Sequence, residues 1–226
     1  MLKKILNVLK KARGYTLVEV AAVVAVTGML SAVVMTAAKY TYERSKLNAA
    51  SEDIEKIYGA IQAFYNDTGD YPVRFSRDVY DYYEFLYSGN TLKTKSYGGM
   101  PTIIAGGLSD RLFNHIMQNN PENVNWGAYT GWKGSYLARN FDKYDPWGNS
   151  YIIYTRPLWR EKTYTGKDEE VAWILSGGPN EMIETWPTDI ELQGDDIGMV
   201  ISYGPLARWR PPRRAGTPPL PGVLPR

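Results

Sequence analysis

The sequence contains no cysteine and a single histidine, His115. Without a thiol the chain can form neither a disulfide framework nor a thiolate zinc site, and it has no thiol nucleophile. A lone histidine likewise excludes a metal site built from several imidazoles. Neither the Gly-x-Ser-x-Gly nucleophile motif nor a phosphate-binding loop motif occurs. We therefore predict that the chain is not an enzyme and that His115 is a packed or helix-surface residue.

Acidic residues are absent from both ends of the chain. Residues 1–13 and 208–226 hold ten of the 26 basic groups, whereas all 24 acidic groups lie between these two stretches. The intervening part is net negative, which argues against nucleic acid as the main partner. A length of 226 residues with 44% hydrophobic residues suits one medium-sized domain that has a genuine core and appendages.

Charged residues are also absent between residues 20 and 38. As a helix that rises about 1.5 Å per residue, this run approaches the roughly 30 Å of a bilayer hydrocarbon core. The basic stretch before it predicts that the extreme amino terminus stays in the cytoplasm and that the rest of the chain lies outside. An ordinary signal peptide has its apolar region before the cleavage point. Here a cut after Gly14 would leave the apolar helix on the mature protein.

Glu19 lies at the start of this apolar run. A carboxylate costs about 2.5–3.5 kcal/mol at the centre of a membrane helix and less near the interface, so it needs a partner. Cleavage after Gly14 would create an α-amino group on Tyr15, about one helical turn from Glu19. Opposite charges attract more strongly when both are removed from water.

These residues resemble the class III signal of type IV pilins and pseudopilins, closest to the major pseudopilin of type II secretion. The resemblance implies that a prepilin peptidase cuts after Gly14 and methylates the new amine of Tyr15, and that Glu19 pairs with the amino terminus of a neighbouring subunit during assembly. It also implies a single-pass inner-membrane protein with a periplasmic domain, which an assembly platform builds into a filament with other pseudopilins. Tyr15 replaces the commoner phenylalanine, and Thr36 stands where many relatives have proline. The alternative is a signal anchor with a glutamate at the membrane edge.

The helical pattern continues beyond the apolar run, so we expect one long helix over about residues 20–65. Apolar residues recur at helical spacing and predict a buried stripe, consisting of Leu47, Ile54, Ile57, Ile61 and Phe64. Turn formers at residues 66–72 end the helix. Strands are expected at residues 151–155 and 170–176, after a turn at residues 145–149. The fold class is α+β, with a long amino-terminal helix packed on a small antiparallel sheet, type IV pilin-like.

Four regions follow from these expectations. Residues 1–14 are the leader, residues 15–39 the hydrophobic assembly helix, residues 40–204 the periplasmic α+β domain, and residues 205–226 a Pro/Arg-rich tail. Within the domain, residues 73–140 form a variable connection with a short helix over residues 108–119. Its tyrosines predict aromatic core and packing surface rather than a binding site for carbohydrate; they are Tyr80, Tyr82, Tyr83 and Tyr87.

A polar stretch between Ser176 and Ile201 is rich in acidic residues. Two adjacent aspartates, Asp195 and Asp196, repel each other, and a hard cation with oxygen ligands would relieve that repulsion. The major pseudopilin pattern that this stretch resembles implies calcium held by the side chains of Asn180, Asp195 and Asp196 and by the Leu175 carbonyl. Glu184 and Asp189 are further candidates. The alternative is a solvated acidic loop whose aspartates cap turns.

The leading hypothesis is therefore a structural filament subunit of type II secretion or of a related system. A minor or adhesive type IV pilin is the second candidate. A membrane-anchored carbohydrate-active enzyme that uses two of the many carboxylates is the third, although no pair of carboxylates stands out in the sequence.

Overall fold

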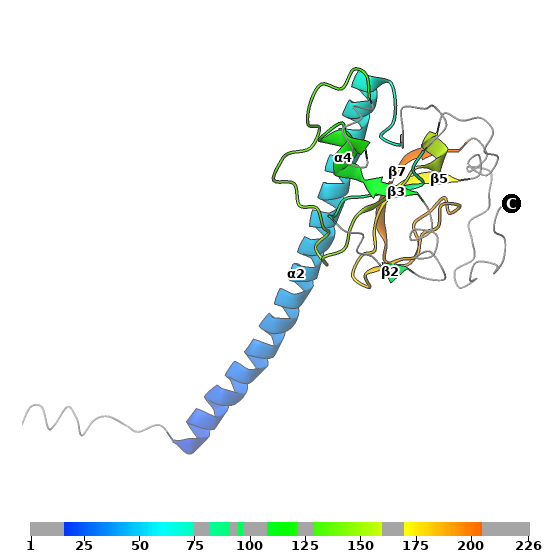
Figure 1. Ribbon diagram of the computed structural model, residues 1–226. Helices are drawn as coiled ribbons and strands as arrows, with labels where there is room; N and C mark the ends of the chain where they lie inside the picture. The colour runs from blue at the N-terminus through cyan, green and yellow to red at the C-terminus, as the bar shows by residue number, and fades with distance from the viewer. Residues whose placement is uncertain are drawn as a thin grey trace, which may run out of the picture. The chain divides into compact units, whose positions relative to one another are not determined.

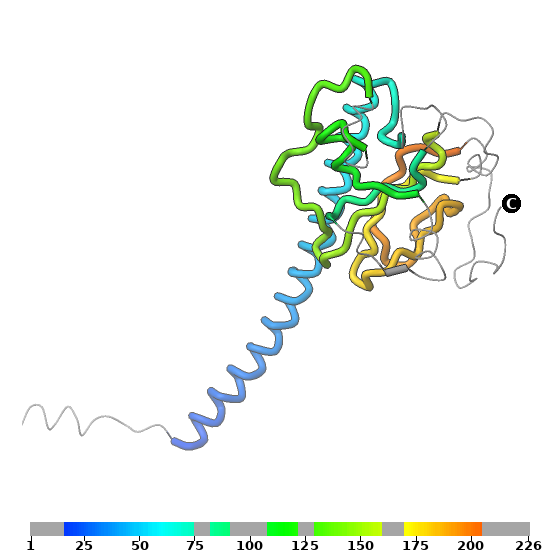
Figure 2. The backbone as a smooth tube through the Cα atoms, viewed as in Figure 1, coloured from blue at the N-terminus to red at the C-terminus, as the bar shows by residue number. Residues whose placement is uncertain are grey.

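The computed structural model describes residues 16–74, 82–90, 95–96, 108–121, 129–159 and 170–204. The predictions for Gly14, Tyr15, Tyr80 and the tail 205–226 lie outside these residues. The chain divides into two units, Met1–Ser45 and Lys46–Arg226, which we describe separately (Figures 1 and 2).

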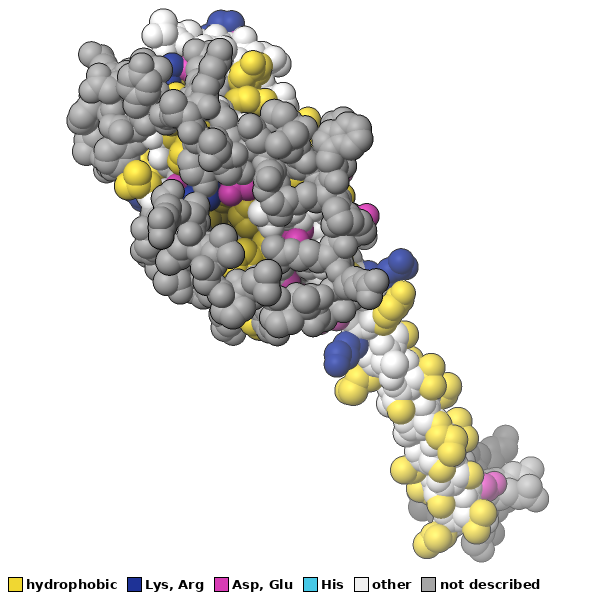
Figure 3. Space-filling model, turned by 90° about the vertical axis from the view of Figure 1, so that its right-hand side faces the viewer, with side chains coloured by type: hydrophobic (Ala, Val, Ile, Leu, Met, Phe, Trp, Pro, Cys, Tyr) yellow, Lys and Arg dark blue, Asp and Glu magenta, His cyan; other side chains and the backbone are white. Residues whose placement is uncertain are grey.

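In the first unit, helix α2 (Leu17–Thr68) begins with an apolar part whose side chains are exposed. Every large apolar residue from Leu17 to Met35 is exposed, and Figure 3 shows such side chains along the face in view. Among the described residues, α2 is the one helix long and apolar enough to cross a membrane. A membrane-capable amino-terminal helix is thus confirmed at the level of length and composition.

In the second unit, α2 buries one stripe of side chains. Four of the five predicted stripe residues are buried, namely Ile54, Ile57, Ile61 and Phe64, and two small residues that fit the same spacing join them, Ala50 and Ala60. The prediction for Leu47 is wrong, because this side chain is 36% exposed and precedes the first buried turn. The helix ends as expected at Thr68, and Gly69 follows in the left-handed region with φ of 70°.

The main sheet of the second unit has five strands in the order β3-β1-β4-β5-β7. Their bounds are β1 Phe85–Tyr87, β3 Ser109–Arg111, β4 Ile152–Tyr154, β5 Val171–Ser176 and β7 Ile197–Tyr203. A second sheet pairs β2 (Lys95–Ser96) with β6 (Met182–Ile183) in parallel. The shorter elements are helix α4 (Leu112–Ile116) and the 3-10 helix η2 (Arg156–Leu158).

The prediction of a purely antiparallel sheet is wrong. β1 pairs with β3 in parallel, whereas the pairs β1–β4, β4–β5 and β5–β7 are antiparallel. A parallel pair needs a long crossover connection, and the chain between Tyr87 and Ser109 is long enough to supply one. The helix expected over residues 108–119 is also shorter than predicted, because its first residues form β3. The α+β arrangement, a long helix packed on a small mixed sheet, is confirmed.

The two faces of the main sheet are covered by different parts of the chain. Ile153 and Ile174 share a core cluster with the buried stripe of α2. Their neighbours Ile152 and Leu175 belong to a second cluster that includes Ile183, beyond the end of β5. Alternate residues of a strand point to opposite faces, so α2 covers one face and the segment that follows β5 contributes to the other.

The tyrosine-rich stretch contributes to the core where it is described. Tyr82 and Tyr83 are buried, and Tyr87 is half-buried in β1. Tyr83 packs edge-on against His115, with ring centroids 5.5 Å apart. The packing role predicted for these described tyrosines is confirmed.

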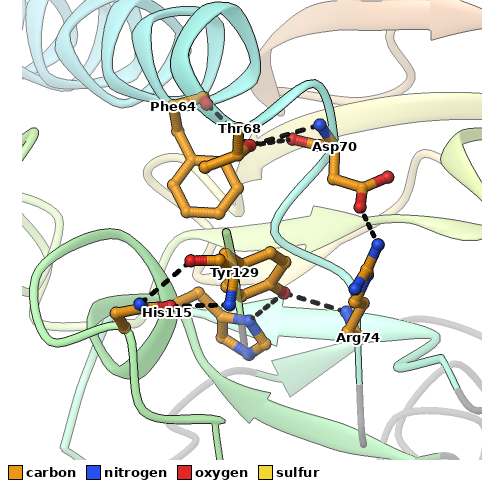
Figure 4. Close-up of polar contacts among 7 residues, drawn as sticks. Phe64, Thr68, Asp70, Arg74, His115 and Tyr129 are labelled. Atoms are coloured by element: carbon orange, nitrogen blue, oxygen red, sulfur yellow. Dashed lines mark hydrogen bonds and ion pairs between the residues drawn. The ribbon is translucent and has the colours of Figure 1, made fainter. Parts of the chain in front are cut away.

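His115 is fully buried in α4 and joins a chain of polar contacts. Its Nδ1 lies 2.8 Å from the Tyr129 hydroxyl, which accepts a hydrogen bond of 3.0 Å from the Arg74 backbone N–H (Figure 4). Its Nε2 lies 3.1 Å from Asp110 Oδ2, close enough for electrostatic attraction but outside hydrogen-bond geometry. Tyr129 thus holds the Arg74 amide and the His115 ring in one buried polar chain. The packed interpretation of His115 is confirmed.

Replacing Tyr129 by phenylalanine should destabilise the domain by about 1–3 kcal/mol, because it leaves the Arg74 amide and the His115 ring without a buried partner. The matched control is Tyr136→Phe, since the Tyr136 hydroxyl donates to Asp67 in a less buried place. It should change the free energy of unfolding by less than about 0.5 kcal/mol. Urea denaturation of both detergent-solubilised variants measures the difference. Equal losses would contradict the role assigned to the buried chain.

Candidate functional site

The start of α2 is fixed by a reciprocal pair of hydrogen bonds between Thr16 and Glu19. The Thr16 backbone N–H and hydroxyl both donate to Glu19 Oε2, at 2.8 and 2.9 Å, and the Glu19 backbone N–H donates to Thr16 Oγ1 at 3.2 Å. This is a capping box, in which each side chain satisfies a backbone group that the first helical turn leaves free. The sequence carries the signature of this motif, a threonine followed three residues later by glutamate.

The capping box gives the Glu19 carboxylate a local role beside the one expected from assembly. A carboxylate in the first turn is also favoured by the positive end of the helix dipole. Both Thr16 donors bind the same carboxylate oxygen, Oε2. Thr16 directly follows Tyr15, so the proposed new amine would arise one residue before the group that holds Glu19.

The acidic stretch after β5 brings three of the four predicted calcium ligands into one hydrogen-bonded group. The Asn180 backbone N–H donates to Asp195 Oδ2 at 2.9 Å. Asp196 Oδ2 accepts the backbone N–H groups of Glu184 and Thr185, at 2.9 and 2.6 Å. Asn180 Nδ2 donates to Glu184 Oε2 at 3.2 Å, which joins the two halves. We call these residues, Asn180, Glu184, Asp195 and Asp196, the acidic group.

Leu175, the fourth predicted ligand, lies inside β5 rather than in the acidic group. It pairs with Ile152 of β4 and Gly198 of β7, and its side chain belongs to the second core cluster. The hydrogen bonds of the acidic group do not include its carbonyl among the described residues. The structure thus brings Asn180, Asp195 and Asp196 together and leaves the role of Leu175 without support from a contact.

The two further candidates separate clearly. Glu184 is a member of the acidic group through its bond with Asn180. Asp189 instead caps a local turn, because its Oδ2 accepts the Trp186 backbone N–H at 2.8 Å and its own N–H donates to the Trp186 carbonyl at 2.9 Å. The alternative of a loop whose aspartates cap turns therefore holds for Asp189. In Asp195 and Asp196, only the Oδ2 atom accepts backbone N–H groups of the described residues.

The second carboxylate oxygen of each of the two adjacent aspartates is buried in the acidic group. Asp195 Oδ1 and Asp196 Oδ1 are buried and have no hydrogen-bond partner within the described part of the chain. Asp196 is only 7% exposed, and this burial raises its pKa to about 6, although the hydrogen bonds from Thr185 and Glu184 favour the charged form. Buried carboxylate oxygens without a donor fit a hard cation such as calcium, which prefers oxygen ligands.

The carboxylates of the described residues do not form a metal centre by themselves. Over the described residues, no three His, Cys, Asp or Glu side chains converge closely enough to hold an ion. Calcium also accepts backbone carbonyls and amide oxygens, and the amide oxygen of the acidic group, Asn180 Oδ1, accepts the Met182 backbone N–H at 2.7 Å. Oxygen donors of this kind are the ligands that calcium accepts. At present the Oδ2 atoms of Asp195 and Asp196 accept backbone N–H groups, and Glu184 Oε2 accepts the Asn180 side-chain amide.

Backbone geometry brings the two ends of the loop close together. Gly178 has φ of 59°, and a Cβ at this position would collide with the Asp195 backbone oxygen. Glu181 adopts φ of 62° without being glycine, a conformation that costs about 1–3 kcal/mol when held in a native structure. Such local strain often occurs at functional sites. The Gly-Gly-Pro-Asn sequence was the visible signal of this tight turn.

Comparisons with known proteins found no protein family, no curated protein and no solved structure that matches this chain.

Proposed function

We propose that this chain is a structural subunit of a type II secretion pseudopilus or of a related type IV pilus-like filament. The observation that carries the proposal is the first part of α2, an apolar helix whose large side chains are exposed from Leu17 to Met35 and which has one ionisable residue, Glu19, in its first turn. So much apolar surface has to be covered by a bilayer before assembly and by neighbouring helices after it.

In this proposal the chain is a pilin-like protein, closest to the major pseudopilins. Prepilin peptidase cuts after Gly14 and the Tyr15 amine is methylated. The product waits in the inner membrane as a single-pass protein with its carboxyl-terminal domain in the periplasm. The assembly platform then extracts it, and it stacks with copies of itself and with other pseudopilins. No reaction is catalysed by the subunit itself.

Glu19 has two uses in this scheme. Before assembly the Thr16 donors satisfy its carboxylate, which lowers the cost of holding a charge at the membrane edge. During assembly the α-amino group of a neighbouring subunit binds the same carboxylate. An ion pair removed from water is far stronger than one in solvent, so it sets the register of adjacent helices.

Calcium is the proposed cofactor. Asn180, Asp195 and Asp196 would hold it, with the Leu175 carbonyl as a backbone ligand, and it would neutralise the adjacent carboxylates and stabilise the loop. The Oδ1 atoms of Asp195 and Asp196, which have no hydrogen-bond partner among the described residues, support this assignment. The adhesive pilin is less favoured as an alternative, because Tyr82 and Tyr83 are core residues. The enzyme alternative gains no specific support, since His115 is buried and bonded to Tyr129.

Mass spectrometry of the mature amino terminus tests the processing step. In a host that has prepilin peptidase, the chain should begin at a methylated Tyr15. In a matched host without the peptidase, it should begin at Met1 or at the residue after it. A start at Met1 in both hosts would refute the processing step and favour the signal-anchor alternative.

Glu19→Gln should abolish assembly while leaving the protein in the membrane, because glutamine can still close the capping box but carries no charge. Loss of one partner of a desolvated ion pair costs about 3–5 kcal/mol, which corresponds to roughly a hundredfold or greater loss of filament. Glu55→Gln is the control, since Glu55 is an exposed carboxylate of the same helix. Immunoblots of sheared filament and membrane fractions measure the split. Normal filaments from Glu19→Gln would contradict the assembly role.

Calcium at millimolar concentration should raise the melting temperature of the detergent-solubilised protein. Saturation at a hundred times the dissociation constant adds about 2.7 kcal/mol, which is roughly 5–10 °C for a chain of this size. Asp195→Asn should reduce this calcium response. Asp189→Asn should lower the melting temperature but keep the response, since Asp189 caps a turn outside the acidic group. An unchanged melting temperature of the natural sequence would rule out the calcium site.

A further inference from the structure

The turn at residues 145–149 is built around a buried carboxylate. Asp145 is 4% exposed, and its Oδ1 accepts the backbone N–H groups of Trp147 and Asn149 at 3.0 and 2.8 Å. The turn closes further where the Gly148 N–H donates to the Asp145 carbonyl at 2.9 Å, with Gly148 in the left-handed region. These contacts confirm the turn predicted from the sequence. They use only one oxygen of the carboxylate.

The second oxygen of Asp145 reaches the end of β5. Ser176 Oγ donates to Asp145 Oδ2 at 2.6 Å, and Ser176 is fully buried. The same hydroxyl oxygen accepts the Gly178 backbone N–H at 3.3 Å. A hydroxyl has one proton to donate and two lone pairs to accept with, so Ser176 uses both capacities to join two segments.

Beyond Gly178 the connection continues into the acidic group. Gly178 lies so close to the Asp195 backbone that a Cβ would not fit between them. Asp195 Oδ2 in turn accepts the Asn180 N–H. A movement of the Asp195 backbone toward Gly178 therefore has to displace Gly178. Because the Gly178 N–H donates to the Ser176 hydroxyl, that hydroxyl is displaced as well.

On its other side the turn contacts α2. Lys46 Nζ lies 5.8 Å from the centre of the Trp147 ring, within the range of a cation–π interaction. Shortly after the turn, the Tyr151 hydroxyl donates to Asp53 Oδ2 of α2 at 3.2 Å. The turn thus lies between the helix and the end of the strand that leads into the acidic loop.

We propose that Ser176 is a positioning residue that couples the acidic group to the 145–149 turn, so that a cation in the acidic group tightens the turn against α2. The inference rests on the proposed calcium function and deepens it. It gives the cation a structural consequence away from its ligands, at the contacts of the turn with Lys46 and Asp53 of α2. Coupling of this kind is reciprocal, so loosening the turn must also weaken cation binding.

Hydrogen exchange of the full-length protein in detergent micelles, with and without calcium, tests the coupling. In the natural sequence, calcium should slow exchange of the Trp147 and Asn149 amides by about fivefold or more, the usual lower range for coupled sites. In Ser176→Ala the slowing should fall below about twofold, and the calcium concentration at half-effect should rise. Ser176→Thr keeps the hydroxyl and should restore both.

Each outcome separates the two proposals. Absence of any calcium effect on the melting temperature of the natural sequence overturns the calcium site and the coupling together. A raised melting temperature with unchanged exchange at Trp147 and Asn149 overturns the coupling alone, and this result needs no variant to fold. Equal slowing in Ser176→Ala and in the natural sequence also overturns it.

Discussion

The structure depends on one constraint: a single uninterrupted helix, α2, has an exposed apolar part and a part whose side chains are buried in the core. From Leu17 to Met35 its large apolar side chains are exposed. From Ala50 to Phe64 a stripe of side chains is buried in the main core. An apolar helical surface that stays exposed is unfavourable in water, which is why the filament proposed above has a membrane and then neighbouring copies cover it.

The main sheet buries the stripe of α2 side chains against one of its faces. A strand alternates its side chains between two faces, so covering one face with α2 leaves the opposite face to be buried by something else. The segment after β5 contributes Ile183 and Ile190 to that face, and the Trp173 indole donates to the Asp189 carbonyl at 3.0 Å. The acidic loop is therefore part of the fold, and its few apolar anchors explain why polar contacts have to hold the remainder.

Structural features that local periodicity determines could be predicted from the sequence, whereas features that depend on the pairing of distant residues could not. The stripe from Ile54 to Phe64 and the turn around Asp145 were predictable because their chemistry is written within a few residues. β7 was missed because its seven residues are all half-buried, with no clean alternation of apolar and polar side chains. The parallel pairing of β1 with β3 depends on residues far apart in the chain. At the sites, the members of the acidic group were predicted from the sequence, and the capping box also has a sequence signature. The hydrogen bond between Ser176 and Asp145 joins residues far apart in the chain, so it required the structure.

The capping box changes how the charge of Glu19 should be understood. A carboxylate without hydrogen bonds at a membrane edge is energetically unfavourable. The Glu19 carboxylate accepts two hydrogen bonds from Thr16, so it is already satisfied at the start of its own helix. Assembly would then exchange one set of partners for another instead of rescuing an isolated charge. The net gain from the exchange is smaller than the full strength of the ion pair, because the Thr16 bonds have to be loosened or shared. In the proposed filament, a subunit held this way would wait in the membrane with its carboxylate satisfied. It would then bind the α-amino group of a neighbour, whose full positive charge a threonine hydroxyl and amide cannot match.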